Sequence, residues 1–317
     1  MPSLVVASHD NDVLDEATLR LITAASGRWG SLDALVAGCN CRGPATELAA
    51  VPGVTRVLIA DSPSLREHLA EPMAHLLCKT AASYDAVLAV ASNDGRDFLP
   101  RTAALLDVAQ VSDVEEILAP NRFRRVSHSG RASETTQSAA RVQLLTVRAS
   151  TFAAAPRHGG AAMIHTVPEP DPWTRTRVIA QTKCHASDPR LEAARRVIGL
   201  GRGVHGREQA ATVTRIAKLL DAAIGGTRPA VECGLVPDQQ MLGQSGKVIF
   251  PDLYIAVGVS GAPEHMYGVQ DSAIIVSINN DPRAPIVTAA DFCLVGDLAD
   301  ALPELERELT RLRDESP

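Results

Sequence analysis

Residues 253–265 read LYIAVGVSGAPEH, a strand-like run followed by a glycine turn and the first residues of an expected helix. LYIAVGV contains six apolar residues and one glycine without polar alternation, which is typical of a strand covered on both faces. Ser260 stands where the strand ends. Free backbone amides at a helix start, with Gly261 permitting close approach, favour an anion. This stretch therefore predicts a parallel α/β sheet with a ligand at its carboxyl edge.

The same alternation of buried strands and helix-like stretches runs through both halves of the chain. It is typical of βαβ crossovers, which place helices on both faces of a parallel sheet. The predicted strands lie at residues 3–8, 32–38, 54–62, 84–92, 195–201, 253–259, 273–279 and 291–297. Helices are predicted at residues 14–29, 63–83, 188–196, 207–223 and 303–313.

The pattern changes at Phe123, after which polar turns separate short strands. These predict an antiparallel extension of the first sheet, at residues 123–130, 133–139 and 142–150. A proline-punctuated stretch then leads to one more predicted strand at 175–182, and we place the domain boundary next to Lys183. The predicted fold class is α/β with two domains. Residues 1–183 form a nucleotide-hydrolase-like domain with a parallel sheet, and residues 184–317 form a doubly wound domain.

Composition limits the class of protein. With 317 residues, 45% of them hydrophobic and 21% charged, the chain has the make-up of a globular protein of two domains. A net charge of −6 and 3% aromatic residues argue against nucleic acid as a main partner. No apolar run reaches about 18 residues, so we expect no membrane span, and the first residues do not have the pattern of an export signal. The six scattered cysteines are interpreted as reduced thiols.

Two glycine-containing stretches are candidates for phosphate binding. Residues 243–247, GQSGK, resemble a phosphate loop, but the loop is two residues short and Val248 follows where Ser or Thr is required. Residues 201–206, GRGVHG, form a literal dinucleotide fingerprint between a strand and a helix. The acidic residue that should end the next strand is missing, because Asp221 falls inside the predicted helix. A nicotinamide site and a plain tight turn both stay open for this motif.

Polar side chains end several predicted strands. Ser260, Asn279 and Asp297 follow consecutive strands, at the edge where open α/β sheets bind ligands. Thr227 and Arg228 lie in a turn that we expect to precede a strand. Each residue alone is consistent with a cap or a turn, but together they predict a ligand crevice.

A series of motifs in the second half is specific enough to suggest a family. They are TRPAVE (227–232), GLVP (234–237), LGQSGK (242–247), PDLYIAVGVSGAPEH (251–265), INNDPRAP (278–285) and ADFCLVGDL (290–298). HDN (9–11), LPRTAALLD (99–107) and QVSDV (110–114) agree in the first half. In order and spacing these motifs resemble the electron-transferring flavoprotein alpha subunit over nearly the whole chain. The resemblance implies a C-terminal domain that binds FAD.

The resemblance implies roles around the flavin ring. Arg228 matches an arginine that lies over the ring and favours an anionic semiquinone through its permanent charge. His265 matches a histidine beside the pyrimidine-end carbonyl. Ser245 occupies a threonine position whose hydroxyl contacts the ring nitrogen that takes the electron. The other loop residues that the resemblance assigns to the cofactor are Leu242, Gly243, Gln244, Pro263 and Glu264.

Contacts along the rest of FAD are implied as well. Arg202 matches the arginine of a G-R-G turn beside the diphosphate, which makes residues 201–206 a phosphate turn and disfavours an NAD site. Thr227 stands where the family usually has a serine beside the diphosphate. The remaining assigned residues are Ser260, Gly261 and Ala262 at the ribityl and phosphate region, and Asn279, Asp297 and Leu298 at the adenosine end.

Departures from the family pattern fall beside the expected flavin. Pro263 and Glu264 replace the usual Ile-Gln before the histidine, and a carboxylate there would oppose an anionic flavin unless it points to solvent. Met266, Tyr267 and Gly268 replace Leu-Ala-Gly. These changes bear on the redox potential and on the choice of dehydrogenase.

The implied function is that of an electron carrier without substrate turnover of its own. The chain would form a heterodimer with a smaller beta subunit that packs against the N-terminal domain and holds any AMP. Electrons would arrive from acyl-CoA or related dehydrogenases, as in fatty acid beta-oxidation, and leave singly to a membrane quinone oxidoreductase. The expected location is cytoplasmic, or the mitochondrial matrix after removal of a transit segment. The alternatives are a nicotinamide-dependent oxidoreductase that uses residues 201–206 and a cofactor-free interaction module.

Overall fold

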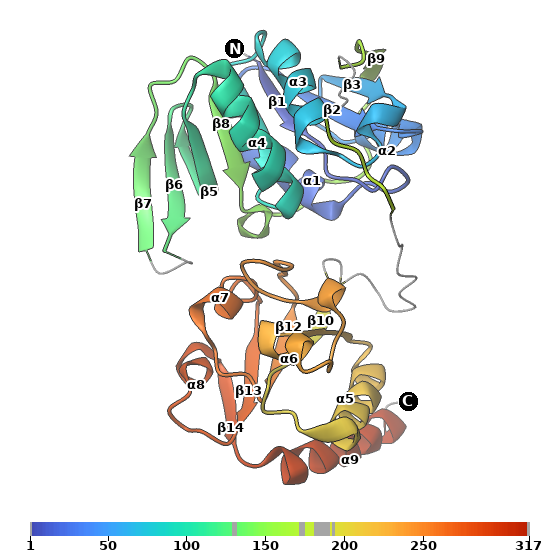
Figure 1. Ribbon diagram of the computed structural model, residues 1–317, viewed down its shortest axis with the longest axis vertical. Helices are drawn as coiled ribbons and strands as arrows, with labels where there is room; N and C mark the ends of the chain where they lie inside the picture. Colours follow the sequence, from blue (N-terminus) through green and yellow to red (C-terminus); the bar gives the residue numbers. More distant parts are fainter. Residues whose placement is uncertain (1, 129–131, 171–174, 181–190, 192–193, 316–317) are drawn as a thin grey trace. The chain divides into compact units, whose positions relative to one another are not determined.

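The computed structural model describes residues 2–128, 132–170, 175–180, 191 and 194–315, which belong to two compact units, Met1–Thr182 and Lys183–Pro317 (Figure 1). We call them the N-terminal and the C-terminal unit. Each is built on a β-sheet with helices on both faces. The predicted α/β class is confirmed, because the first sheet is large and mostly parallel and the second is parallel throughout.

The sheet of the N-terminal unit has nine strands within the described residues, in the order β7-β6-β5-β8-β4-β1-β2-β3-β9. β6 pairs antiparallel with β5 and β7, and the other neighbours pair in parallel. The strand order reverses between β1 and β4. The strands are β1 (Ser3–Val6), β2 (Leu32–Gly38), β3 (Arg56–Asp61), β4 (Ala86–Val90), β5 (Gln110–Ala119), β6 (Arg122–Ser127), β7 (Ala132–Gln137), β8 (Gln143–Val147) and β9 (Met163–Thr166).

Helices cover both faces of this sheet and enclose two apolar cores. α1 and α2 pack on one face, and α3 and α4 on the other. Side chains satisfy free amides at two helix starts: Asp15 accepts from the Ala17 amide at α1, and Ser92 accepts from the Gly95 amide at α4. The helices are α1 (Glu16–Ala25), α2 (Arg42–Ala49), α3 (Ala70–Ala81) and α4 (Asn93–Leu106), with single 3₁₀ turns at Pro63–Leu65 and Ala149–Thr151.

The structure corrects the prediction for the region after Phe123. β6 and β7 form the expected antiparallel extension, but β8 lies between β4 and β5 and pairs in parallel with both. Every residue of β8 is buried, as in the centre of a parallel sheet. β5 and β9 have mixed polar sequences and are not predicted.

The strand predicted at 175–182 is wrong over its described part. Residues 175–180 form no strand, and Ile179 is 91% exposed, so no neighbouring strand or helix buries this run. Residues 181 and 182 lie outside the described ranges.

The C-terminal unit has a five-stranded parallel sheet in the order β11-β10-β12-β13-β14. Numbered from its own first strand, this order is 2-1-3-4-5, so it reverses between β10 and β12. The strands are β10 (Arg196–Leu200), β11 (Ala223–Gly226), β12 (Leu253–Val257), β13 (Ile275–Asn279) and β14 (Phe292–Val295).

Helices lie on both faces of this second sheet, which makes the unit doubly wound as predicted. α5, α6 and α9 pack on one face, and α7 and α8 on the other. Their bounds are α5 (Gly206–Leu220), α6 (Arg228–Glu232), α7 (Pro263–Met266), α8 (Pro285–Ala289) and α9 (Leu298–Glu315), with a 3₁₀ turn at Asp238–Gln240.

The region around Thr227 differs from the prediction. The helix expected to reach residue 223 ends at Leu220, because Asp221 takes a left-handed conformation with φ 49° at the C-cap. β11 comes next, so Thr227 follows a strand instead of preceding one, and its hydroxyl caps α6. The helix predicted at 188–196 lies mostly outside the described residues, and Arg196 begins β10.

Candidate functional site

The C-terminal unit contains a cavity of ≈ 960 Å³ at the carboxyl ends of β10, β11, β12 and β13. It lies where the strand order reverses, the position at which open α/β sheets bind their ligands. Its volume falls at the upper end of the ≈ 300–1,000 Å³ usual for small-molecule and cofactor sites. The site therefore has room for a ligand larger than a mononucleotide's phosphate group.

The floor of this cavity is made of backbone from two glycine turns. A Cβ on Gly201 would lie 2.1 Å from the Gly258 carbonyl oxygen, and the Gly203 amide donates to that same oxygen over 3.0 Å. Gly258 has φ 61°, a conformation that favours glycine. The turns after β10 and β12 thus approach each other at backbone distance, which leaves the crevice above them open.

The start of α5 gives one end of the cavity an affinity for anions. α5 has 15 residues and begins at Gly206, directly after the turn that carries Arg202 and His205. Arg202 is exposed toward solvent and lines the cavity. The His205 side chain does not cap the helix, so amides of its first turn stay available for a ligand. A helix start with an adjacent guanidinium suits a diphosphate.

Residues 241–247 form a closed loop on another wall. The Lys247 amide donates to the Met241 carbonyl over 2.8 Å, and the Gln244 amide donates to the Glu264 carbonyl over 2.7 Å. Gly243 has φ 135°, and a Cβ there would lie 2.7 Å from the Glu264 oxygen. The loop is therefore fixed against the start of α7.

Arg228 and Ser245 meet across this wall. Arg228, the first residue of α6, donates from Nη2 to Ser245 Oγ over 2.6 Å. Because Oγ accepts this bond, the hydroxyl hydrogen of Ser245 stays available to donate into the cavity. The pair combines a fixed positive charge with a hydrogen-bond donor.

His265 lies in the wall of the cavity and is only 5% exposed. Its Nε2 is 2.8 Å from the Tyr254 hydroxyl, and its Nδ1 is 3.2 Å from the Leu242 carbonyl oxygen. Burial lowers the pKa of this imidazole to about 4, so the ring is neutral at neutral pH. Glu264, the preceding residue, is exposed and also lines the cavity.

Asn279 connects two loops at the end of β13. Its Nδ2 donates to the Val259 carbonyl over 2.7 Å, and its Oδ1 accepts from the Asp281 amide over 3.0 Å. The side chain is 8% exposed. Both ends of the amide thus stabilise the loops that border the cavity.

We expect Asn279→Ala to lower the free energy of unfolding of the C-terminal unit by about 1–3 kcal/mol, because the buried Val259 carbonyl and the part-buried Asp281 amide lose their partner. Urea denaturation of the full chain measures the change. Asn280→Ala, an exposed neighbour, is the matched control and should leave stability unchanged. Equal stability of the two variants would contradict this role.

The cavity brings together most of the residues assigned from the sequence. Those that line it are Arg202, Thr227, Arg228, Leu242, Gly243, Gln244, Ser245, Ser260, Ala262, Glu264, His265 and Asn279. Residues that line it without having been assigned singly are Gly201, Gly203, His205, Pro229, Met241, Gly258, Asp281 and Ala284. The first three belong to the GRGVHG turn. Asp281 comes two residues after Asn279, so its place just beyond the strand end could have identified it as a site residue.

The other assigned residues are not among those that line the cavity. Asp297 accepts from the Ala299 amide at the start of α9, and Leu298 is buried in the core against α5. Gly261 packs its backbone against Ile286, and Pro263 occupies the first turn of α7. The structure gives each of these residues a role in local folding and does not bring it to the cavity wall.

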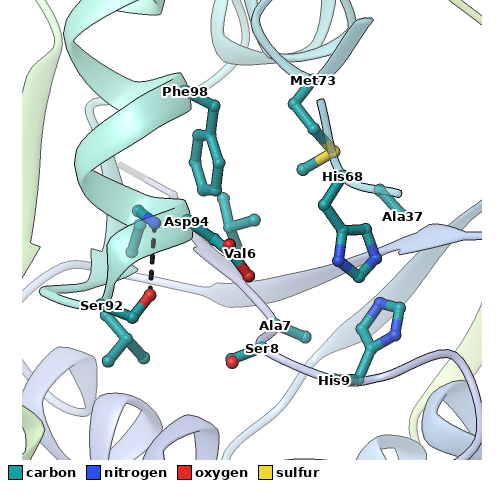
Figure 2. A pocket seen from close by; sticks show the side chains of 13 residues that line it. Val6, Ala7, Ser8, His9, Ala37, His68, Met73, Ser92, Asp94 and Phe98 are labelled. Carbon is teal, nitrogen blue, oxygen red and sulfur yellow. Dashed lines mark hydrogen bonds between the residues drawn. The ribbon is translucent and has the colours of Figure 1, made fainter. Parts of the chain in front are cut away.

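The corresponding crevice of the N-terminal unit is closed by side chains (Figure 2). The cavity at the carboxyl ends of β1 and β4 measures only ≈ 20 Å³, about the space of one water molecule. The rings of His9 and His68 meet edge to face there, with centroids 4.9 Å apart. Met73 and Phe98 also line this cavity, and Met73 lies next to His68.

Within the described residues, no cluster of three or more His, Cys, Asp or Glu side chains could hold a metal ion. None of the helices in the same ranges has the length and apolar character needed to cross a bilayer.

A doubly wound sheet with a cavity of this size at its reversal point, next to a helix start and an arginine, defines a protein that binds a dinucleotide-type cofactor. Comparison with known proteins shows which family within this class the chain matches. A family model described as the electron transfer flavoprotein domain matches residues 3–172, and one described as the electron transfer flavoprotein FAD-binding domain matches residues 190–270.

Curated relatives agree over nearly their full length. The electron transfer flavoprotein subunit alpha of Pseudomonas aeruginosa is 41% identical, over 97% of this chain and 99% of that protein. The subunit alpha of Paracoccus denitrificans is 38% identical, over 98% and 100%. The probable mitochondrial subunit alpha of Caenorhabditis elegans is 38% identical, over 97% and 93%. The chain belongs to the electron transfer flavoprotein alpha subunit family, so it is an electron carrier and not an enzyme, and its cofactor is FAD.

The residues present fit that cofactor. The backbone floor leaves space for a phosphate chain, and Arg202 with the start of α5 supplies positive charge for a diphosphate. Leu242, Met241 and Ala262 give the cavity apolar wall for a flat ring. Size, charge and wall chemistry agree with a large, anionic, partly apolar ligand.

Proposed function

We propose that this chain is the FAD-bearing subunit of a heterodimer that accepts electrons from acyl-CoA or related dehydrogenases and passes them singly to a membrane quinone oxidoreductase. The observation that supports it best is the cavity at the reversal point of the second sheet, walled by the Arg228–Ser245 pair. When bound, FAD supplies the ring that takes up and releases the electrons. The chain's own residues hold and orient that ring and set its surroundings.

Each wall has a distinct task in this proposal. Arg202 and the first turn of α5 bind the diphosphate, while the loop at residues 241–247 positions Ser245. Arg228 holds a permanent positive charge in the cavity wall, which would favour negative charge on a group bound there. Glu264 is exposed, so solvent screens its carboxylate, and its opposing effect is small.

We assign the two domains different tasks. Residues 184–317 bind FAD, and residues 1–183 pack against the beta subunit. The closed crevice of the N-terminal unit supports this division, because the position that would hold a nucleotide is filled by His9, His68 and Phe98. The relatives include bacterial and mitochondrial proteins, which supports a cytoplasmic or matrix location.

The absorbance spectrum of the chain, purified after co-expression with its beta subunit, tests the proposal. We expect a yellow heterodimer that releases about one FAD per alpha chain on denaturation. Release of NAD without flavin would favour the nicotinamide-dependent alternative at residues 201–206. A colourless protein without cofactor would favour an interaction module.

We expect Ser245→Ala to lower the reduction potential of the bound FAD by roughly 20–60 mV, the equivalent of one neutral hydrogen bond. The variant loses a donor that lines the cavity but keeps the fold of its loop, which is held by backbone bonds. Spectroscopic reduction against a reference dye measures the shift. A potential equal to that of the unmodified protein would leave Ser245 with a scaffolding role only.

A further inference from the structure

Tyr254 is a fully buried tyrosine whose hydroxyl reaches the wall of the cavity from inside the sheet. It lies on β12 with no solvent exposure, and its oxygen is 2.8 Å from His265 Nε2. The two rings are 6.0 Å apart and tilted by 44°. Tyr254 itself does not line the cavity, whereas His265 does.

The direction of the hydrogen bonds follows from the partners. The Leu242 carbonyl can only accept, so His265 Nδ1 must carry the hydrogen of that bond. In a neutral imidazole Nε2 is then the acceptor, and the Tyr254 hydroxyl donates to it. Both ring nitrogens are therefore occupied within the protein.

A glycine on the neighbouring strand makes room for this contact. Val197 of β10 is the register partner of Tyr254, and Gly199 is the next residue on the same face. A Cβ on Gly199 would lie 1.9 Å from the tyrosine oxygen. Any larger residue there would displace the hydroxyl that reaches His265.

We propose that Tyr254 is a positioning residue for the FAD site: together with Gly199 and the Leu242 carbonyl, it holds His265 in one orientation as a neutral ring with no free nitrogen. In relation to FAD this rests on the function proposed above, but the arrangement is a property of the chain itself. His265 then contributes shape and a neutral surface to the cavity. The charge comes from Arg202, Arg228, Glu264 and Asp281, which line the same cavity.

The titration of His265 follows from its surroundings. Its pKa lies near 4 because burial opposes the charged ring, and the Leu242 carbonyl raises it only in part. Without the tyrosine hydroxyl, Nε2 is a buried acceptor without a partner. That state is unfavourable, so the ring should turn toward cavity water, where the pKa returns toward its ordinary value.

The experiment is a pH titration of the histidine ring signals by NMR, on the full chain with labelled histidine. His265→Gln identifies the signal. In the unmodified chain we expect no titration of His265 between about pH 5.5 and 8. In Tyr254→Phe we expect a titration within that window, a rise in proton affinity of about thirtyfold or more from the pKa of about 4. Gly199→Ala should have the same effect, because it displaces the hydroxyl without removing it.

Tyr84→Phe is the matched control. Its hydroxyl is also buried and bonded, to Asp33 Oδ2 over 2.6 Å, but it lies in the N-terminal unit. This variant should leave the His265 titration unchanged. A flat His265 signal in both Tyr254→Phe and Gly199→Ala, or a titrating signal in the unmodified chain, would overturn the proposal.

A second measurement connects this role to the cofactor. In the FAD-loaded heterodimer, Tyr254→Phe should make the reduction potential depend more steeply on pH near the new pKa of His265, a change that simple loss of packing would not produce. Failure of the chain to bind FAD would contradict the proposed function but leave the NMR result intact. The two proposals can therefore fail separately.

Discussion

Replacing Arg228 by alanine is expected to lower the reduction potential of the bound FAD by roughly 60–130 mV while FAD stays bound. The estimate takes about 1.5–3 kcal/mol for an interaction with a charged group, and for one electron about 59 mV corresponds to a tenfold change. Arg228 adds a positive charge to the cavity wall and is fixed by Ser245 Oγ. The measurement is potentiometric reduction of the purified heterodimer.

Two further variants complete this experiment: one keeps the positive charge at position 228, and the other is a control that removes an arginine outside the cavity. Arg228→Lys keeps the charge and should recover part of the potential, although it cannot reproduce the planar guanidinium. Arg195→Ala removes an arginine of the same unit that pairs with Asp252 and is 82% exposed, and it should change nothing. An Arg228→Ala protein with an unshifted potential would rule out the assigned electrostatic role.

Acid is expected to destabilise the N-terminal unit through His9, by up to about 3 kcal/mol between pH 6.5 and 4. Burial, followed by the nearby His68, lowers the pKa of His9 to about 4, and the Asn11 amide donates to its Nδ1, which only the neutral ring can accept. The unfolded chain binds a proton near pH 6.5 and the folded chain does not. The stabilisation is therefore complete above pH 6.5 and is lost as pH falls toward 4. Urea unfolding at a series of pH values measures the slope.

His9→Gln should remove much of this slope, since its amide oxygen can still accept from Asn11 without titrating. His158→Gln, at an exposed histidine of the same unit, is the control and should keep the full slope. Burial also lowers the pKa of His68, so His68→Gln should flatten the curve as well. Parallel curves for the unmodified chain and His9→Gln would show that carboxylates, and not this pair, govern acid unfolding.

Continuous apolar runs made most of the sheet predictable. β1 to β4, β12 and β13 lie within the strands expected, because a strand buried on both faces favours apolar side chains at most of its positions. β11 could not be found in this way. Its sequence is AIGG, and it forms because it pairs along β10, a contact that local propensity does not encode.

The site was predictable where it depends on strand ends. Ser260 and Asn279 follow β12 and β13, and both line the cavity. Thr227 was assigned to the site with the wrong local structure, since it follows β11. The Tyr254–His265 hydrogen bond could not be predicted from the sequence. It needs the space left by Gly199, which lies diagonally across from Tyr254 on the adjacent strand β10, and spacing along the chain does not reveal such a neighbour.

The contact between the glycine turns at Gly201 and Gly258 has a consequence for how this protein can be altered. Here main chain touches main chain, so any larger residue at Gly201 would place its Cβ 2.1 Å from the Gly258 carbonyl oxygen, and one at Gly258 would place its Cβ 2.8 Å from the Gly203 backbone. The floor can therefore hold a ligand, but substitutions in the floor offer no means of adjusting the reduction potential of that ligand. Changes of the reduction potential must come from the cavity wall, at Arg228 and Ser245, and an engineer who wants a new potential should leave the floor intact.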